Sequence, residues 1–387
     1  MRLNGWPGRQ IRATYAGFAV FGGFWGTWGA SIPQIRDQAG VTVGELGTAL
    51  LFVGAGALPA MLLTGRLVDR WGRPAAAALL ALLGLVGVAV AVTARDLTSL
   101  SIGLAVLGAS SGAADVAINT AAGSAQQASG RQVITRAHAA FSLAVVVSSL
   151  LTGALLGRGA SLAVPFVLLA VVAVAAAVAL LLGADRHAGS CAVRELRGAG
   201  RHGLVVAVGP LLALGVLGAV AFAVENGHQS WSALYLRDAA QAGPVTAAAG
   251  PAVFAGTVAV ARLAASSLAV RHATAVLVTG SLTAATGTAL VGAASTVPAS
   301  LLGLGIAAAG TAVLFPTLLG VLNSRVPEHS RGTATSVVTA VAYLGFLAGP
   351  VYVGSWASGT GLSAAMFALA ALAAILAPLA AVRLRLK

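Results

Sequence analysis

Long apolar segments recur along almost the whole chain, separated by short polar connections. A helix needs about 20 apolar residues to cross ~30 Å of hydrocarbon. Segments of this length predict twelve membrane-spanning helices, at 12–33, 45–64, 74–94, 97–122, 138–157, 161–183, 204–226, 247–270, 273–293, 298–322, 333–354 and 362–382. Trp231 and Tyr235 lie just beyond the seventh segment, and an outward extension of that helix would include them.

The composition excludes a soluble globular protein. Apolar residues make up 58% of the 387 residues and charged residues 9%, against roughly a quarter charged in soluble domains. In hydrocarbon every backbone polar group must be bonded within the chain, which leaves helical bundles and closed barrels. The sequence has 49 glycines, long apolar runs and few segments in which apolar and polar residues alternate as they do in barrel strands. We therefore expect an all-α membrane protein.

The basic residues predict how the chain is oriented. If both termini are cytoplasmic, all 23 lysines and arginines fall at the cytoplasmic side except Arg36, Arg95, Arg158 and Arg237. The positive-inside rule predicts this bias. The net charge of +13 therefore reports topology and contact with membrane lipid headgroups, and we expect no nucleic-acid partner.

Enzymatic and cofactor chemistry find little support in the sequence. Cys191 is the single cysteine, so neither a disulfide framework nor a cluster of thiolate metal ligands is expected. The sequence contains no phosphate-binding glycine loop, so ATP-driven pumping is not expected. An intramembrane enzyme needs a nucleophile with its base, or several metal ligands, at one depth. Asp115 and His138 do not make such a set, so we expect no enzyme, no metal and no cofactor.

The order of the segments suggests an internal duplication. Six lie in residues 1–183 and six in 204–387, on either side of a polar stretch at 184–203. Paired halves of this kind are common in transporters. We expect two six-helix halves joined by a cytoplasmic linker.

The connection between the second and third segments carries a distinctive sequence, Gly65-Arg-Leu-Val-Asp69-Arg70-Trp-Gly72-Arg73. It resembles the G-x-x-x-D-R-x-G-R loop signature of the major facilitator superfamily, at the expected place. The two glycines permit a tight turn and close backbone approach. The resemblance implies that Asp69 helps to close the cytoplasmic side by engaging the other half near residues 332–335. The alternative is a generic basic loop.

Five further segments extend the resemblance: 31–36, 115–119, 138–142, 231–235 and 343–350. They are similar to a bacterial branch that contains the rhizopine-associated membrane protein, distantly similar to fucose permeases. This resemblance implies the major facilitator fold, a place in the bacterial inner membrane and a sugar-like solute. The fifth predicted helix lacks the glycine- and proline-rich signature of proton-coupled drug antiporters.

Three ionisable residues are candidates for proton coupling, because a charge within hydrocarbon is costly and needs a cavity or a partner. Asp115 has Ser111 and Asn119 four residues to either side, on one helical face. His138 opens the fifth segment at roughly the depth of Asn119. Glu225 ends the apolar part of the seventh segment. For each the alternative is structural: a permanently bonded carboxylate, a neutral hydrogen-bonded histidine, or a solvated loop.

Other polar and aromatic residues are candidates for binding a solute, and interhelical hydrogen bonding or interfacial anchoring is the alternative for all of them. Arg262 is a separate case, since it can bind an anion, pair with a carboxylate or extend to the membrane surface. The binding candidates are Trp28, Gln34, Asn119, Asn226, Trp231 and Tyr343.

Together these features predict a secondary transporter that moves a small organic solute by alternating access. Protons are the expected driving ion, a sugar-like compound the expected solute, and a monomer the expected state. Efflux of a metabolite or drug is the alternative. A solute sensor that keeps the fold without transporting is the alternative from another class.

Overall fold

The computed structural model describes residues 6–182, 208–265, 272–327 and 330–385, and the regular structure in these ranges is helical. Its contacts divide the chain into two compact units. One unit comprises Met1–Val41 and Phe52–Arg201, and the other comprises Thr42–Leu51 and His202–Lys387. The linker expected at 184–203 lies outside the described residues.

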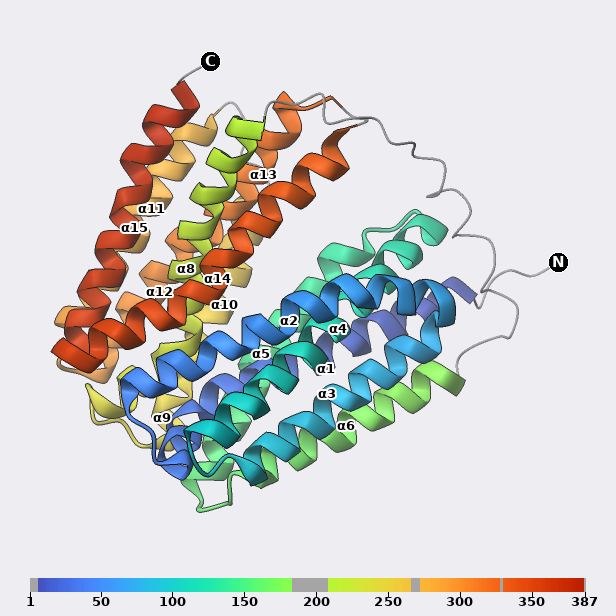
Figure 1. Cartoon of the computed structure of the whole chain (residues 1–387), viewed down its shortest axis with the longest axis horizontal. Helices are drawn as coiled ribbons and strands as arrows, with labels where there is room; N and C mark the ends of the chain where they lie inside the picture. The colour runs from blue at the N-terminus through green and yellow to red at the C-terminus, as the bar shows by residue number, and fades with distance from the viewer. Residues whose placement is uncertain (1–5, 183–207, 266–271, 328–329, 386–387) are drawn as a thin grey trace. The chain divides into compact units, whose positions relative to one another are not determined.

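Helices α1 to α6 are the first six predicted segments, and most are longer than predicted (Figure 1). The polar ends that extend them are invisible to a search for apolar residues. Their bounds are α1 (Trp6–Ala39), α2 (Val43–Trp71), α3 (Arg73–Thr93), α4 (Leu97–Ser129), α5 (Val133–Gly157) and α6 (Ala163–Leu182).

The second unit holds the other six segments, two of which are interrupted. The eighth breaks at Ala248 and the tenth at Val313. Helix α8 runs on to Asp238, so it includes Trp231 and Tyr235 as the longer alternative required. The helices are α8 (Val208–Asp238), α9 (Pro244–Ala247), α10 (Ala249–Ala265), α11 (Ala273–Ala293), α12 (Val297–Ala312), α13 (Leu314–Arg325), α14 (Arg331–Thr360) and α15 (Leu362–Arg385).

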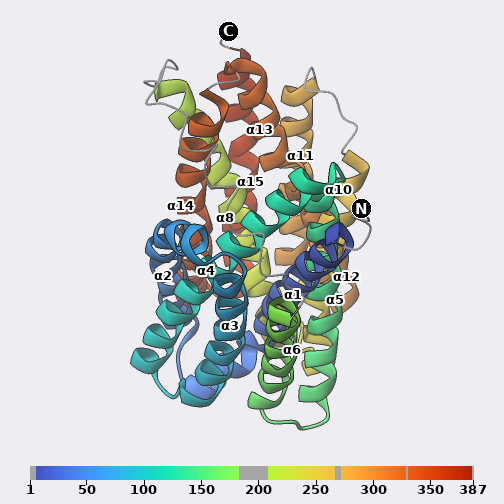
Figure 2. The same cartoon turned by 90° about the vertical axis from the view of Figure 1, so that its right-hand side faces the viewer.

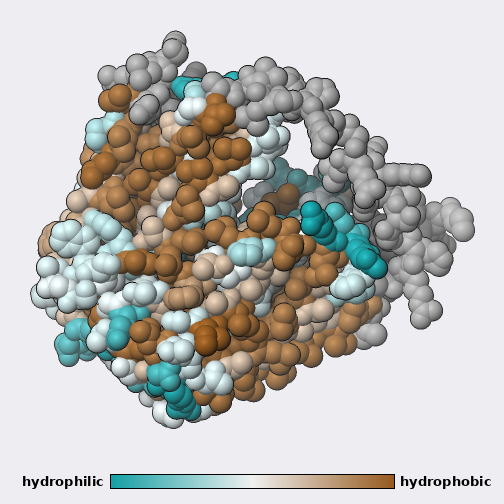
Figure 3. Space-filling model, in the orientation of Figure 1, coloured by the Kyte–Doolittle hydropathy of each residue, from teal (hydrophilic) through white to brown (hydrophobic). Residues whose placement is uncertain are grey.

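The exposed surface is apolar, as a membrane protein requires. In the described part of the chain, 11 helical segments are long and apolar enough to cross a membrane by length and composition. Helix α1 is long enough but falls outside this set because glycines and tryptophans dilute its apolar run. Figure 3 shows apolar side chains over much of the visible face. Leu62 is 81% exposed and Val260 67%. The all-α membrane fold expected from the sequence is confirmed.

Glycines let several pairs of helices pack in very close contact, among them α1 with α5 in the first unit and α8 with α14 in the second. In the first, a Cβ atom at Gly22 or Gly26 of α1 would overlap the backbone of α5 at Phe141 or Val145. In the second, Gly345 and Gly349 of α14 approach the carbonyls of α8 in the same way. Glycines four residues apart on one helical face permit such close crossings.

Other helices pair side by side within each unit, α3 with α6 and α11 with α15 (Figures 1 and 2). The first turns of α2 belong to the second unit because they pack on α14. A Cβ at Gly47 would lie 2.8 Å from the Cα of Gly354, so only glycine fits there. The first turns of α2 are therefore part of the second unit, and the rest of the helix, from Phe52 on, is part of the first.

Candidate functional site

Asp115 lies in the middle of α4, between the faces that contact two other helices. Three residues earlier, a Cβ at Gly112 would meet the Ala57 carbonyl of α2 at 2.9 Å. Three residues later, Ile118 lies against Gly17 of α1. Steps of three residues place Asp115 between these two contacts on the α4 surface. Its half-buried carboxylate therefore faces the space between α1 and α2.

The carboxylate of Asp115 is held by a neutral group. Nδ2 of Asn119 donates to Asp115 Oδ1 and to the Asp115 carbonyl oxygen, both at 2.9 Å. Among the described residues no cationic side chain forms an ion pair with Asp115. Without a permanent counter-charge, a carboxylate in this position can both release and bind a proton.

Helix α1 carries buried polar atoms close to the solute candidates of the sequence. Trp28 is 3% exposed and Ser31 is fully buried. Ser31 Oγ and Gln34 Oε1 have no hydrogen-bond partner among the residues that the structure describes. Buried polar atoms without partners are costly, and a bound polar group can satisfy them. This stripe of α1 is therefore suited to contact a polar solute.

His138 lies near the start of α5, with an exposed side chain. Its ring packs edge-on against Phe18 of α1, with centroids 5.0 Å apart. The Asp115 carboxylate accepts a hydrogen bond from Asn119. A histidine relay to that carboxylate stays a prediction.

The turn after α2 is tight at Gly72, as the sequence predicts for this glycine. Gly72 has φ 55° and donates from its N–H to the Val68 carbonyl at 2.7 Å. A non-glycine residue adopts this φ at a cost. Arg70 lies 6.0 Å from the Trp71 ring centre.

The surroundings of Asp69, Arg73 and Gly65 do not test the roles expected of them. Asp69 is exposed and Arg73 half-buried. A Cβ at Gly65 would meet no atom of the described residues within 4 Å, so the close backbone approach expected there is not seen among them. The role of Asp69 in closing the cytoplasmic side stays a prediction.

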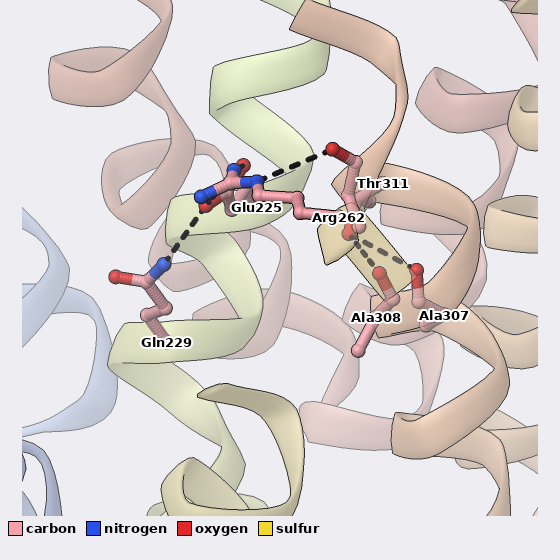
Figure 4. Close-up of polar contacts among 7 residues, drawn as sticks. Glu225, Gln229, Arg262, Ala307, Ala308 and Thr311 are labelled. Atoms are coloured by element: carbon pink, nitrogen blue, oxygen red, sulfur yellow. Dashed lines mark hydrogen bonds and ion pairs between the residues drawn. The ribbon is translucent and has the colours of Figure 1, made fainter. Parts of the chain in front are cut away.

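Three helices of the second unit meet at an ion pair, drawn in Figure 4. Nη2 of Arg262, from α10, lies 3.1 Å from both carboxylate oxygens of Glu225, from α8. Nε of Arg262 donates to the Ala312 carbonyl at the end of α12 over 3.2 Å. Gln229 donates to Glu225 Oε1 at 3.3 Å. Of the roles considered for Arg262, pairing with a carboxylate is confirmed.

The sequence of the tenth segment explains why the Ala312 carbonyl is available. Pro316 has no N–H, and Ala312 is the residue four positions earlier whose carbonyl that N–H would have bonded. The helix breaks between α12 and α13 at this point. Arg262 supplies the missing donor, so the proline and the arginine together fix the geometry of the break.

Asn226 and Trp231, two further solute candidates, are bonded to the backbone of α14. Asn226 Nδ2 donates to the Phe346 carbonyl at 2.6 Å. The fully buried Trp231 donates from Nε1 to the Pro350 carbonyl at 3.2 Å. In this conformation both side chains join α8 to α14, which matches the interhelical alternative.

Tyr343 belongs to an aromatic cluster with Phe222 and Phe315. Its ring is 5.8 Å from Phe222, which precedes Glu225 by one turn of α8. Phe222 is 4.3 Å from Phe315, just after the break at Val313. All three rings are half-buried. The cluster is thus a partly accessible apolar wall within the second unit.

His228 is a buried polar residue whose environment the sequence did not reveal. Its Nε2 lies 2.8 Å from Thr288 Oγ1, and Thr288 donates its own proton to the Ala284 carbonyl. Nε2 must therefore carry the histidine proton, which makes Nδ1 an acceptor. Nδ1 has no partner within the described ranges, and neither has Oγ of Ser232 one turn later. The sequence pointed to His228 only through its position three residues after Glu225, on the same face of the helix.

The fold and these intramembrane polar clusters define a multi-pass membrane transporter. Residues 14–274 match the Major Facilitator Superfamily, and the chain belongs to this family. It is 30% identical to an uncharacterized MFS-type transporter of Yersinia pestis over 349 residues, which covers 88% of this chain and 87% of the relative. An uncharacterized transporter of Sinorhizobium fredii is 29% identical over 372 residues, or 95% and 97% of the two chains.

Solved structures agree on the fold. A bacterial homolog of the human lysosomal transporter Spinster superposes with a TM-score of 0.79 at 15% identity, covering 99% of this chain and 98% of that one. The nucleoside transporter NupG gives a TM-score of 0.74 at 12% identity, covering 99% and 100%. Identities this low support the shared fold alone.

Proposed function

We propose that this protein is a proton-coupled secondary transporter of a small organic solute. The observation that carries the proposal is Asp115, an intramembrane carboxylate bonded to the neutral amide of Asn119. An alternating-access carrier needs a group that binds a proton on one side of the membrane and releases it on the other. The secondary candidates are His138 and Glu225, whose carboxylate is paired with Arg262.

The solute is proposed to be sugar-like and the direction to be uptake. Both follow from the resemblance of five segments to the rhizopine and fucose-permease branch. The polar atoms of Ser31 and Gln34 support a hydroxylated solute, since hydroxyl groups both donate and accept hydrogen bonds. Trp28, Asn119, Asn226, Trp231 and Tyr343 remain proposed contacts. Comparing growth of a deletion strain on candidate carbon sources with its sensitivity to toxins distinguishes uptake from efflux.

The cellular setting is part of the same proposal. The chain functions as a monomer in the bacterial inner membrane, with both termini in the cytoplasm and its basic residues near anionic lipid headgroups. The partners are the solute, protons and lipid.

Transport into proteoliposomes tests the coupling. A pH gradient should drive solute uphill in the parent, whereas Asp115→Asn should retain only downhill exchange. Asp96→Asn is the matched control, because Asp96 precedes the same helix and asparagine caps helices equally well. Uphill transport by Asp115→Asn at the parental level would exclude this carboxylate. A parent that binds solute but shows no counterflow would be a sensor.

A further inference from the structure

Arg262 lies on the interior face of α10, which decides what its exposed part can meet. The buried residues Phe254 and Val258 precede it at spacings of four. At about 100° per residue, Arg262 is roughly 40° from Val258 on the helix surface. The strongly exposed apolar residue Val260 is roughly 160° away. Arg262 therefore extends from the side of α10 that packs on α8 and α12, and 42% of its side chain remains exposed there.

The guanidinium is only partly used by the protein. It has five N–H groups in a planar fork. Nε binds the Ala312 carbonyl, and Nη2 alone bridges the two oxygens of Glu225. Within the described residues no hydrogen bond is assigned to Nη1. Carboxylates prefer two parallel bonds to two nitrogens of the fork, so the contact with Glu225 leaves the better binding edge of Arg262 accessible.

The groups around the ion pair suit an organic anion. Phe222 precedes Glu225 by one turn of α8, and Phe315 follows Ala312, whose carbonyl Arg262 binds, by three residues. Their half-buried rings lie 4.3 Å apart. They offer an apolar wall to the body of a solute. Gln229 lies on the other side of Glu225, where its amide can hold that carboxylate when Arg262 is engaged elsewhere.

We propose that Arg262 binds the carboxylate of the transported solute, a small organic acid whose ring packs against the Phe222 and Phe315 side chains. The solute carboxylate takes the Nη1–Nη2 edge and displaces Glu225 towards Gln229. One cation cannot fully compensate two carboxylates, so Glu225 competes with the solute and holds Arg262 in its absence. This inference rests on the proposed transport function and narrows its sugar-like solute to an acidic one.

Matched pairs of acidic and neutral compounds test the inference. Thermal-shift titrations of the purified protein would compare glucuronate with glucose, and benzoate with benzamide. We expect at least one acid to bind and its neutral counterpart to bind at least tenfold more weakly. Arg262→Gln should weaken acid binding more than tenfold, since glutamine lacks the charge that makes the hydrogen bonds to a carboxylate strong. Arg262→Lys should bind with intermediate affinity, because lysine keeps the charge but loses the fork.

Two further variants keep the test decisive. Arg158→Gln removes an exposed arginine at the end of α5 and should leave acid binding unchanged. Glu225→Gln removes the competitor and should tighten acid binding several-fold, even if Arg262→Gln does not fold. Equal binding of acids and neutral counterparts, or weaker acid binding by Glu225→Gln, would overturn the inference.

Counterflow in proteoliposomes separates this inference from the function on which it rests. If the parent exchanges neutral sugars and ignores acids, the assignment of Arg262 fails while the transport proposal stands. If the parent binds acids through Arg262 but exchanges nothing across the bilayer, the binding site stands and the transport proposal fails.

Discussion

The side-chain amide of Asn226 donates to the carbonyl oxygen of Phe346, the carbonyl that α14 itself cannot bond because residue 350 is proline. One turn further, Trp231 donates to the carbonyl of Pro350 itself. Two side chains of α8 thus bond to the backbone of α14, one at the proline and the other one turn before it. A proline that would otherwise weaken α14 becomes the point at which another helix is attached.

Asn226→Ala should destabilise the protein by about 1–3 kcal/mol, the cost of leaving a buried carbonyl without a donor. The reduction should appear as a lower melting temperature of the purified protein in detergent. Pro350→Ala provides the matched background, because alanine restores an N–H that can bond the Phe346 carbonyl. Asn226→Ala should cost clearly less in that background. An equal cost in both backgrounds would show that the bond to Phe346 is not what Asn226 contributes.

Gly345→Ala should destabilise the packing of α14 on α8. Its Cβ would overlap the Ala219 carbonyl, and backbone must move to make room. Overpacking of this kind costs about 1–3 kcal/mol. Gly359→Ala is the control on the same helix, since a Cβ there meets nothing within 4 Å. It should be neutral or stabilise by up to about 1 kcal/mol through helix propensity. Similar melting temperatures for the two variants would argue against the close crossing.

Thr288→Val should destabilise the second unit by about 1–3 kcal/mol, because the Nε2 proton of His228 would lose its buried acceptor. Valine keeps the shape of threonine, so packing changes little. Thr279→Val on the same helix removes an exposed hydroxyl and should have little effect. Thermal unfolding of both variants in one detergent makes the comparison. If Thr288→Val melts like Thr279→Val, the tautomer assigned to His228 is wrong.

Asp96 should contribute stability that depends on pH. Its carboxylate accepts hydrogen bonds from the backbone N–H and the hydroxyl of Ser99, and these bonds lower the pKa of Asp96 below 3.8. A lowered pKa in the folded state means that the contribution is complete above the unfolded pKa and is lost as pH falls through the folded value.

Asp96→Ala should therefore lower the melting temperature at neutral pH. The decrease should be much smaller in strong acid, far below pH 3.8. Asp96→Asn keeps an acceptor for the Ser99 N–H without a titrating charge, so the difference in melting temperature between Asp96→Asn and Asp96→Ala should not vary with pH over this range. Melting curves across pH provide the measurement. A difference between parent and Asp96→Ala that stays constant down to strong acid would contradict the capping role of the ionised carboxylate.

Much of the fold was predictable because each apolar segment must span the bilayer. Twelve segments of about 20 residues, a basic bias to one side and the Gly65–Arg73 sequence were enough to indicate the family. The helix ends were less predictable. Helix α8 continues through Glu225 and His228 to Asp238 because its polar residues are bonded to other helices, which composition does not record.

The polar residues of the candidate site were predictable as a set, since hydrocarbon tolerates few of them. Their partners were not. Spacing of four joined Asp115 to Asn119 correctly, because one turn of helix brings such residues together. No local spacing joins Glu225 to Arg262, or Arg262 to the carbonyl at Ala312.

The sequence by itself determined that this chain is a helical membrane protein of a known transporter superfamily, because hydropathy, charge bias and a loop motif are local properties. Only the tertiary structure decided which polar groups meet. Pro316 and Pro350 each remove a backbone donor, and helices distant in the chain supply the replacement. Such pairings depend on how helices pack, and packing brings together residues whose separation in sequence carries no signal.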